Sequence, residues 1–179
     1  GMYLTGANPT ITNVTISGNT ANYTGGGMNL YESDPTLTNV TISENTANSD
    51  GGGLYCQGNS NPVIVNSILW NNASNEITLH QDGDVNSLTA TYSNIQGGQD
   101  SIITNDNGTV TWGDGNIDVD PLFVDADNDD FNLTADSRCI DTGHPDSTDV
   151  DGTIADMGAF YYDQTGQPVR VHNLITTPS

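Results

Sequence analysis

Aspartates at alternate positions of one loop are the first residues that could do chemistry. Calcium binds six to eight hard oxygen ligands, and alternating carboxylates in a tight loop supply several of them. The sixth position of this loop is Asp130, where an EF-hand needs glycine, so a solvated acidic loop is the alternative interpretation. The candidate calcium ligands, two of them from a second acidic stretch, are Asp125, Asp127, Asp129, Asp136, Asp149 and Asp151.

Tyrosine, amide and hydroxyl side chains form a second candidate group. They occupy the outward positions of one strand in successive sequence repeats, or the position just past it. Aromatic faces beside amides and hydroxyls are typical of a groove that binds sugar rings. Tyrosine is also a common residue of half-exposed strands, so a purely structural role is the alternative. The candidate carbohydrate-binding residues are Tyr3, Asn29, Tyr31, Tyr55, Thr78 and His80.

A repeat of 26 residues must position these groups, because Gly1–Leu4, Gly27–Leu30 and Gly53–Cys56 recur at this step. A fixed period in the twenties is typical of a solenoid, in which each repeat buries its apolar face against its neighbours. Since the repeat contains strand residues and no helical stretch, we predict an all-β, single-stranded parallel β-helix of about four to five coils. Its inward stacks would be Met2/Met28/Leu54/Ile77, Leu4/Leu30/Cys56/Leu79, Ile11/Leu37/Ile64/Ala90 and Ile16/Ile42/Leu69/Ile95.

One asparagine recurs at the same point of three repeats, as Asn13, Asn39 and Asn66. Asparagine is the residue other than glycine that best tolerates a left-handed backbone. We therefore predict a bend at each of these positions. We also predict that their side chains stack along the axis in a hydrogen-bonded ladder.

The charge of the chain limits its partners. Its formal net charge is −21, with two Lys or Arg residues against 23 Asp and Glu. Phosphate binding needs clustered Lys and Arg, so nucleic acid is excluded as a partner. No run approaches the roughly 20 apolar residues of a membrane-spanning helix, and we predict no transmembrane segment. The two cysteines, Cys56 and Cys139, have no spacing motif, and whether they pair is left open.

The repeats resemble those of the pectate-lyase-like superfamily. The run Asn39-Val-Thr-Ile-Ser-Glu-Asn-Thr-Ala47, followed by Gly51-Gly-Gly-Leu-Tyr55, is typical of bacterial extracellular members of this superfamily. The resemblance implies a right-handed parallel β-helix. It also implies that the ladder of first strands is the substrate cleft, where one exists.

The last third of the chain resembles the closing segment of bacterial surface β-helix proteins of the "choice-of-anchor" type. The similarity rests on the stretches 115–125, 131–134, 137–143 and 156–160, with departures at Arg138 and Tyr161. We expect β-helix coils over residues 1–115, a C-terminal capping segment over 116–162 and a linker over 163–179. The residues expected to close the C-terminal end as an apolar plug are Leu122, Phe123, Phe131, Leu133, Ile140, Met157 and Phe160.

Catalytic residues are sparse. A polysaccharide lyase of the resembled superfamily needs a cationic base, but Arg138 and Arg170 both follow the repeats. A glycoside hydrolase needs two carboxylates in one groove, and the acids of the repeats fall in turns. We predict no catalytic residues, and whether the parent protein is an enzyme stays open.

The expected function is a non-catalytic extracellular or cell-surface β-helix module that contacts a polysaccharide or a surface protein, with calcium as a candidate stabilising ion. The alternative is the C-terminal part of a polysaccharide lyase or glycoside hydrolase. The apolar N-terminal edge around Met2, Leu4 and Ile11 is expected to be covered by preceding coils or by another molecule.

Overall fold

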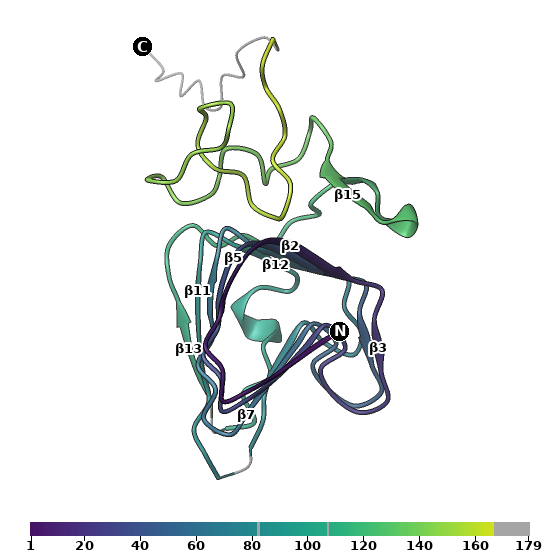
Figure 1. Cartoon of the computed structure of the whole chain (residues 1–179), viewed down its shortest axis with the longest axis vertical. Helices are drawn as coiled ribbons and strands as arrows, with labels where there is room; N and C mark the ends of the chain where they lie inside the picture. The colour runs from purple at the N-terminus through teal and green to yellow at the C-terminus, as the bar shows by residue number, and fades with distance from the viewer. Residues whose placement is uncertain (82, 107, 167–179) are drawn as a thin grey trace, which may run out of the picture.

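The strands of successive repeats stack in parallel in a computed structural model that describes residues 1–81, 83–106 and 108–166. Figure 1 shows the stack from one end, where the coils superpose as a ring. Residues 167–179, which include Arg170 and most of the expected linker, lie outside the described residues.

The first strand of each repeat contributes to a four-stranded parallel sheet. Within this sheet, Met2 lies beside Met28, Met28 beside Leu54, and Leu54 beside Ile77. Successive side chains of a strand alternate between the two faces, so this register stacks the apolar residues inside the coils. The strands are β1 (Met2–Thr5), β4 (Met28–Tyr31), β7 (Leu54–Gln57) and β10 (Ile77–Leu79).

The second part of each repeat builds a seven-stranded sheet. Strand β5 pairs with both β8 and β9, because the third repeat divides in two the strand that the second repeat keeps continuous. A third, two-stranded sheet pairs β3 (Thr20–Ala21) with β6 (Thr46–Ala47). The strands of the larger sheet are β2 (Thr10–Ser17), β5 (Thr36–Ser43), β8 (Val63–Val65), β9 (Ile68–Trp70), β11 (Ser87–Thr91), β12 (Asn94–Ile95) and β13 (Thr109–Trp112).

The interior of the coils is lined mainly by apolar side chains. The four predicted stacks are confirmed by the strand registers, and Leu30, Leu37 and Ile42 have no exposed surface. Burying each such side chain stabilises the fold by roughly 1.5–3 kcal/mol. Four repeats form coils, and β13 begins a further, incomplete one. The predicted parallel β-helix is therefore confirmed.

The left-handed bends occur where the asparagine pattern predicts them, but the predicted side-chain ladder does not. Asn13, Asn39 and Asn66 have φ angles of 55°, 52° and 49°. Their side chains point away from the coils: the Asn39 amide donates to the Asp156 carbonyl, and the Asn66 amide oxygen accepts from the His144 N–H. A side chain that leaves the bend outward meets the C-terminal segment rather than its axial neighbour.

The axial asparagine ladder lies one turn later, at Asn19, Asn45 and Asn72. Oδ1 of Asn45 accepts from the backbone N–H of Asn19 at 3.0 Å and from its side-chain amide at 2.9 Å, and Asn45 donates in the same way to Asn72. Glu76 closes the ladder by accepting from the backbone and the side chain of Asn72. Burial raises the pKa of Glu76 to about 7.

A short segment within the last coil covers the C-terminal end of the stack. It contains the 3₁₀ helix η1 (Gln99–Ser101), and Figure 1 shows this helix inside the outline of the coils. The next residue, Ile102, is 6% exposed and belongs to the apolar core of the coils.

The C-terminal segment, residues 116–166, packs on the flank of the stack instead of closing its end. Figure 1 shows it in green and yellow, outside the ring on the side of β2, β5 and β12. It begins with the antiparallel pair β14 (Phe123–Asp125) and β15 (Asp130–Leu133), joined by η2 (Ala126–Asn128). The expected apolar plug is corrected here, because four of its members pack against outward residues of the coils: Phe123, Leu133, Ile140 and Met157 meet Ile68, Trp70 and Tyr92.

Candidate binding cleft

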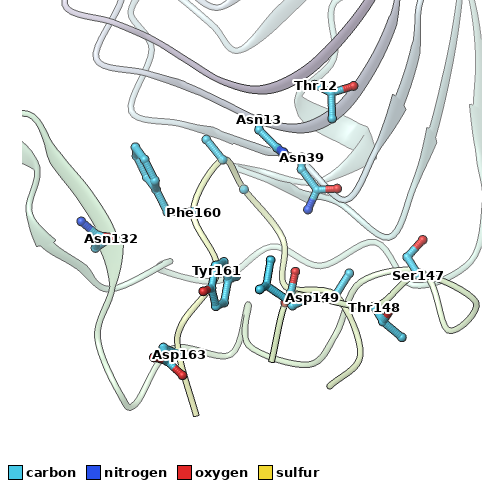
Figure 2. Close-up of a pocket in the computed structure, with 14 residues that line it drawn as sticks. Thr12, Asn13, Asn39, Asn132, Ser147, Thr148, Asp149, Phe160, Tyr161 and Asp163 are labelled. Atoms are coloured by element: carbon cyan, nitrogen blue, oxygen red, sulfur yellow. The ribbon is translucent and has the colours of Figure 1, made fainter. Parts of the chain in front are cut away.

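A cleft of about 610 Å³ opens between the flank of the first two coils and the C-terminal segment. Figure 2 shows Asn13 and Asn39 on the coil side and Phe160, Tyr161 and Asp149 on the segment. Its lining residues are Thr12, Asn13, Asn39, Asn132, Ser147, Thr148, Asp149, Val150, Ala155, Gly158, Ala159, Phe160, Tyr161 and Asp163.

The coil wall of the cleft follows from the asparagine bends. A left-handed residue turns its side chain out of the strand, so Asn13 and Asn39 present their amides to the cleft at adjacent coils. An amide both donates and accepts hydrogen bonds. This wall therefore suits a ligand rich in hydroxyl groups.

The opposite wall is held against the coils by backbone hydrogen bonds. The N–H of Gly158 donates to the Asn66 carbonyl at 2.8 Å, and the N–H of Ala159 donates to the Thr41 hydroxyl at 3.0 Å. Gly158 has a φ of +101°, and a Cβ there would lie 2.8 Å from Ile68 Cδ1. Glycine is therefore required at this close approach, which positions Phe160 and Tyr161 at 43% and 40% exposure.

Asp156 connects the turns behind this wall. It is 1% exposed, and its two carboxyl oxygens accept from the N–H groups of Asp141 at 2.7 Å and Tyr162 at 2.6 Å. Burial raises the pKa of Asp156 to about 7, although these hydrogen bonds favour its charged form. Its carboxyl group is structural, because it is enclosed rather than presented to the cleft.

Two other carboxyl groups, of Asp149 and Asp163, do line the cleft. Burial raises the pKa of Asp149, whose Oδ2 accepts from the Asp156 N–H. Hydrogen bonds from the hydroxyl and the N–H of Thr165 lower the pKa of Asp163. The cleft thus combines aromatic rings, amides, hydroxyls and carboxylates, which is the set of groups that proteins use to hold a sugar ring.

The predicted carbohydrate ladder on the first sheet is only partly accessible. Tyr3 and Tyr31 are 62% and 39% exposed, but Tyr55 and Thr78 are 4% and 1% exposed. Gly51 passes so close to Tyr55 that a Cβ there would lie 2.8 Å from the tyrosine Cβ, so the loop before β7 covers this face. The half-buried Asn29 and His80 are also engaged: Asn29 donates to the Thr24 hydroxyl, and His80 lies 5.4 Å from the Tyr55 ring.

The predicted calcium ligands are spread along the C-terminal segment. Asp125, Asp127, Asp129 and Asp136 are exposed, while Asp151 is tied to Gln164 and Thr153. Within residues 1–81, 83–106 and 108–166, no group of three or more His, Cys, Asp or Glu side chains is arranged to hold a metal ion.

Both cysteines are buried and unpaired, in separate apolar clusters. Burial raises the pKa of the Cys139 thiol to about 11 and also raises that of Cys56. A reactive thiolate needs a lowered pKa. Their role is therefore packing.

The cleft itself was not predicted. Asn13 and Asn39 were expected in a ladder, Asp149 at a metal site and Phe160 in the end plug, yet all four line the cleft. One signal in the sequence was available. An asparagine at each bend turns a polar side chain outward, and a turn with a purely structural role does not need that side chain. The partner of the Asn39 bend, Asp156, lies more than 100 residues away along the chain.

In the described part of the chain, no helix has the length and apolar content to span a membrane. Comparisons with curated proteins and with solved structures gave no match. The family model described as "right handed beta helix region" matches residues 1–120, which contain all the coils. The chain therefore belongs to the right-handed β-helix family.

Proposed function

We propose that this protein is a non-catalytic carbohydrate-binding module of the extracellular space or bacterial cell surface. The observation that carries the proposal is the cleft, whose lining includes the exposed rings of Phe160 and Tyr161 together with the side chains of Asn13 and Asn39. Rings cover the apolar face of a sugar, and amides exchange hydrogen bonds with its hydroxyls. The surface location rests on the resemblance of the C-terminal segment to closing segments of bacterial surface proteins.

The proposed binding site lies on the flank of the coils rather than on the first sheet. The predicted ladder loses Tyr55 and Thr78 to burial, whereas the cleft is concave and has a volume of the order of a ligand site. Tyr3 and Tyr31 remain exposed, but they belong to the four-stranded sheet, whereas the coil residues of the cleft belong to the seven-stranded sheet.

Titration calorimetry with a panel of hexasaccharides tests this function. Phe160→Ala and Tyr161→Ala should each weaken binding by about tenfold, since one stacked ring contributes on the order of 1–1.5 kcal/mol. Tyr23→Ala is the matched control, because Tyr23 is 78% exposed and does not line the cleft. Equal affinities in all three variants would place the binding site elsewhere.

A glycoside hydrolase is the second candidate function. It is favoured by one observation: two carboxyl groups, those of Asp149 and Asp163, line the same cleft, and such enzymes use a pair of carboxyl groups. Release of reducing ends from a hexasaccharide that binds, abolished in Asp149→Asn and Asp163→Asn, would establish this function and remove the non-catalytic one.

Calcium stabilisation of the loop from Asp125 to Asp136 is a further proposal, supported by the spacing of its carboxylates. An ion that binds only the folded state raises the melting temperature by mass action. Chelator-treated protein should therefore melt higher at millimolar calcium, and an unchanged curve would leave only a solvated acidic loop.

A further inference from the structure

The charge of the cleft carries an inference about its ligand, which rests on the proposed carbohydrate function. We propose that the cleft selects neutral sugars and rejects uronates. Among the residues that the structure describes, its lining contains the carboxyl groups of Asp149 and Asp163 and no Lys, Arg or His side chain. A carboxylate accepts hydrogen bonds from hydroxyl groups but repels a second carboxylate.

Asp163 is the stronger discriminator of the two. Its side chain is exposed, and its Oδ1 accepts from the N–H of Thr165 at 2.9 Å and from the hydroxyl at 2.7 Å. These donors favour the charged form, so the pKa of Asp163 is lowered and the group stays negative at neutral pH. Asp149 is half-buried and partly committed to the Asp156 N–H.

The field of the whole chain acts in the same direction. The formal net charge is −21, and such a potential lowers the local concentration of anions. Arg138 is the one Lys or Arg among the described residues, and it does not line the cleft. The described part of the cleft wall therefore offers a uronate no Lys or Arg side chain to neutralise its charge.

The polar groups that remain suit hydroxyls. Asn13, Asn39 and Asn132 supply amides, and Ser147 and Thr148 supply hydroxyls. These groups both donate and accept, which matches a sugar hydroxyl. A neutral sugar carries a hydroxymethyl group where a uronate carries a carboxylate. The uncharged side chains of the cleft can bind either group, so Asp149 and Asp163 must discriminate between them.

The test compares ligands that differ only in this group. Hexasaccharides of β-1,4-linked glucose, mannose and galactose are titrated into the full chain, and the tightest binder is compared with the same backbone oxidised at C6 to the uronate. We expect the oxidised form to bind at least about tenfold more weakly at low salt, with the ratio shrinking as added salt screens the charges.

Asp163→Asn should narrow this ratio severalfold, because asparagine keeps the acceptor for Thr165 and removes the charge. Asp50→Asn removes the same charge from an exposed residue outside the cleft and should leave the ratio unchanged. A ratio that Asp163→Asn does not alter would overturn the assignment to the cleft.

Two further outcomes distinguish a failure of the selectivity for neutral sugars from a failure of carbohydrate binding itself. An oxidised ligand that binds as tightly as the neutral one, with both weakened by Phe160→Ala, overturns the selectivity and leaves carbohydrate binding in place. Binding by no member of the panel at millimolar concentration overturns the proposed function and the selectivity with it.

Discussion

The coils and the C-terminal segment are stabilised in different ways. In the coils, each residue meets its own counterpart in the next repeat, through backbone hydrogen bonds such as Met28 N–H to Gly53 carbonyl at 2.8 Å and through continuous apolar stacks. The segment meets the coils through an apolar patch and single polar contacts, such as the Asn39 amide with the Asp156 carbonyl. The coils are therefore stabilised by many equivalent contacts, whereas the wall of the cleft depends on a few.

The largest expected effect is the loss of the coils themselves. Leu37→Asp would bury a charge in a stack without polar partners, because Leu37 has no exposed surface. We expect no folded protein by circular dichroism. Thr10→Asp, at an exposed position of the neighbouring strand β2, is the control and should fold. A cooperative melt of Leu37→Asp would mean that residue 37 is more accessible to water than its burial in the structure indicates.

Next in size is a break in the axial ladder. Asn45 is fully buried, and Asn45→Ala removes hydrogen bonds to Asn19, Asn72 and the Ile16 carbonyl. We expect a loss of roughly 2–3 kcal/mol in the free energy of unfolding, measured by urea denaturation. Asn39→Ala should cost about 1–2 kcal/mol, through its left-handed bend and one contact. The reverse order would show that the docked segment stabilises the chain more than the ladder does.

A smaller change should release the segment and keep the coils. Gly158→Ala places a Cβ at a φ of +101° and 2.8 Å from Ile68 Cδ1, which costs about 1–2 kcal/mol. Trypsin reports this cleanly, because Arg138 and Arg170 are its only sites in the sequence. Cleavage after Arg138 should accelerate about tenfold, since 1.4 kcal/mol is a factor of ten. Gly152→Ala, where nothing lies near the added Cβ, tests whether positive φ alone suffices.

A dependence of stability on pH is expected in both regions. Asp156 has a pKa of about 7 against an ordinary value of 3.8, and Glu76 has about 7 against 4.5. A raised pKa means that the folded state favours the protonated carboxyl. The two carboxyl groups therefore stabilise the folded state most at a pH below their pKa values in the unfolded chain. This contribution is lost as the pH rises through about 7, their pKa in the folded state.

Hydrogen exchange between pH 5 and 8, corrected for the intrinsic rate, assigns this effect to each region. Asp156→Asn should flatten the dependence in peptides of the C-terminal segment, and Glu76→Gln should flatten it in the coils. Better protection of the segment at pH 8 than at pH 5 would contradict the structure around Asp156.

The repeat allowed the coils to be predicted from the sequence. Residues 26 positions apart become axial neighbours, so aligning Leu4, Leu30 and Cys56 was equivalent to knowing their register. The same signal existed for the true ladder, since Asn19 and Asn45 are also 26 apart. Periodicity alone, however, does not say which of two asparagine columns turns its side chains toward the axis.

The site could not be predicted in this way. Contacts such as Asn39 with Asp156 occur once and join residues far apart in the sequence, so no period reveals them. The burial of Tyr55 depends on the path of the loop containing Gly51, which strand alternation does not describe. Local patterns gave the direction of each side chain on its strand, but not what lies against it.

The path of the C-terminal segment limits how this protein can change in length. It leaves the last coil at Asn94, crosses to the first coil at Ser17, and then returns to contact the third coil at Asn66 and the second at Asn39. Solenoids commonly gain or lose whole repeats, because each unit contacts only its neighbours. Here an inserted coil would displace these contact points by about 4.8 Å, the spacing of adjacent strands. The fixed spacing of these contact points thus restricts the number of coils that the segment can pack against. We expect duplication of a repeat to preserve the stack of coils but to disrupt the cleft.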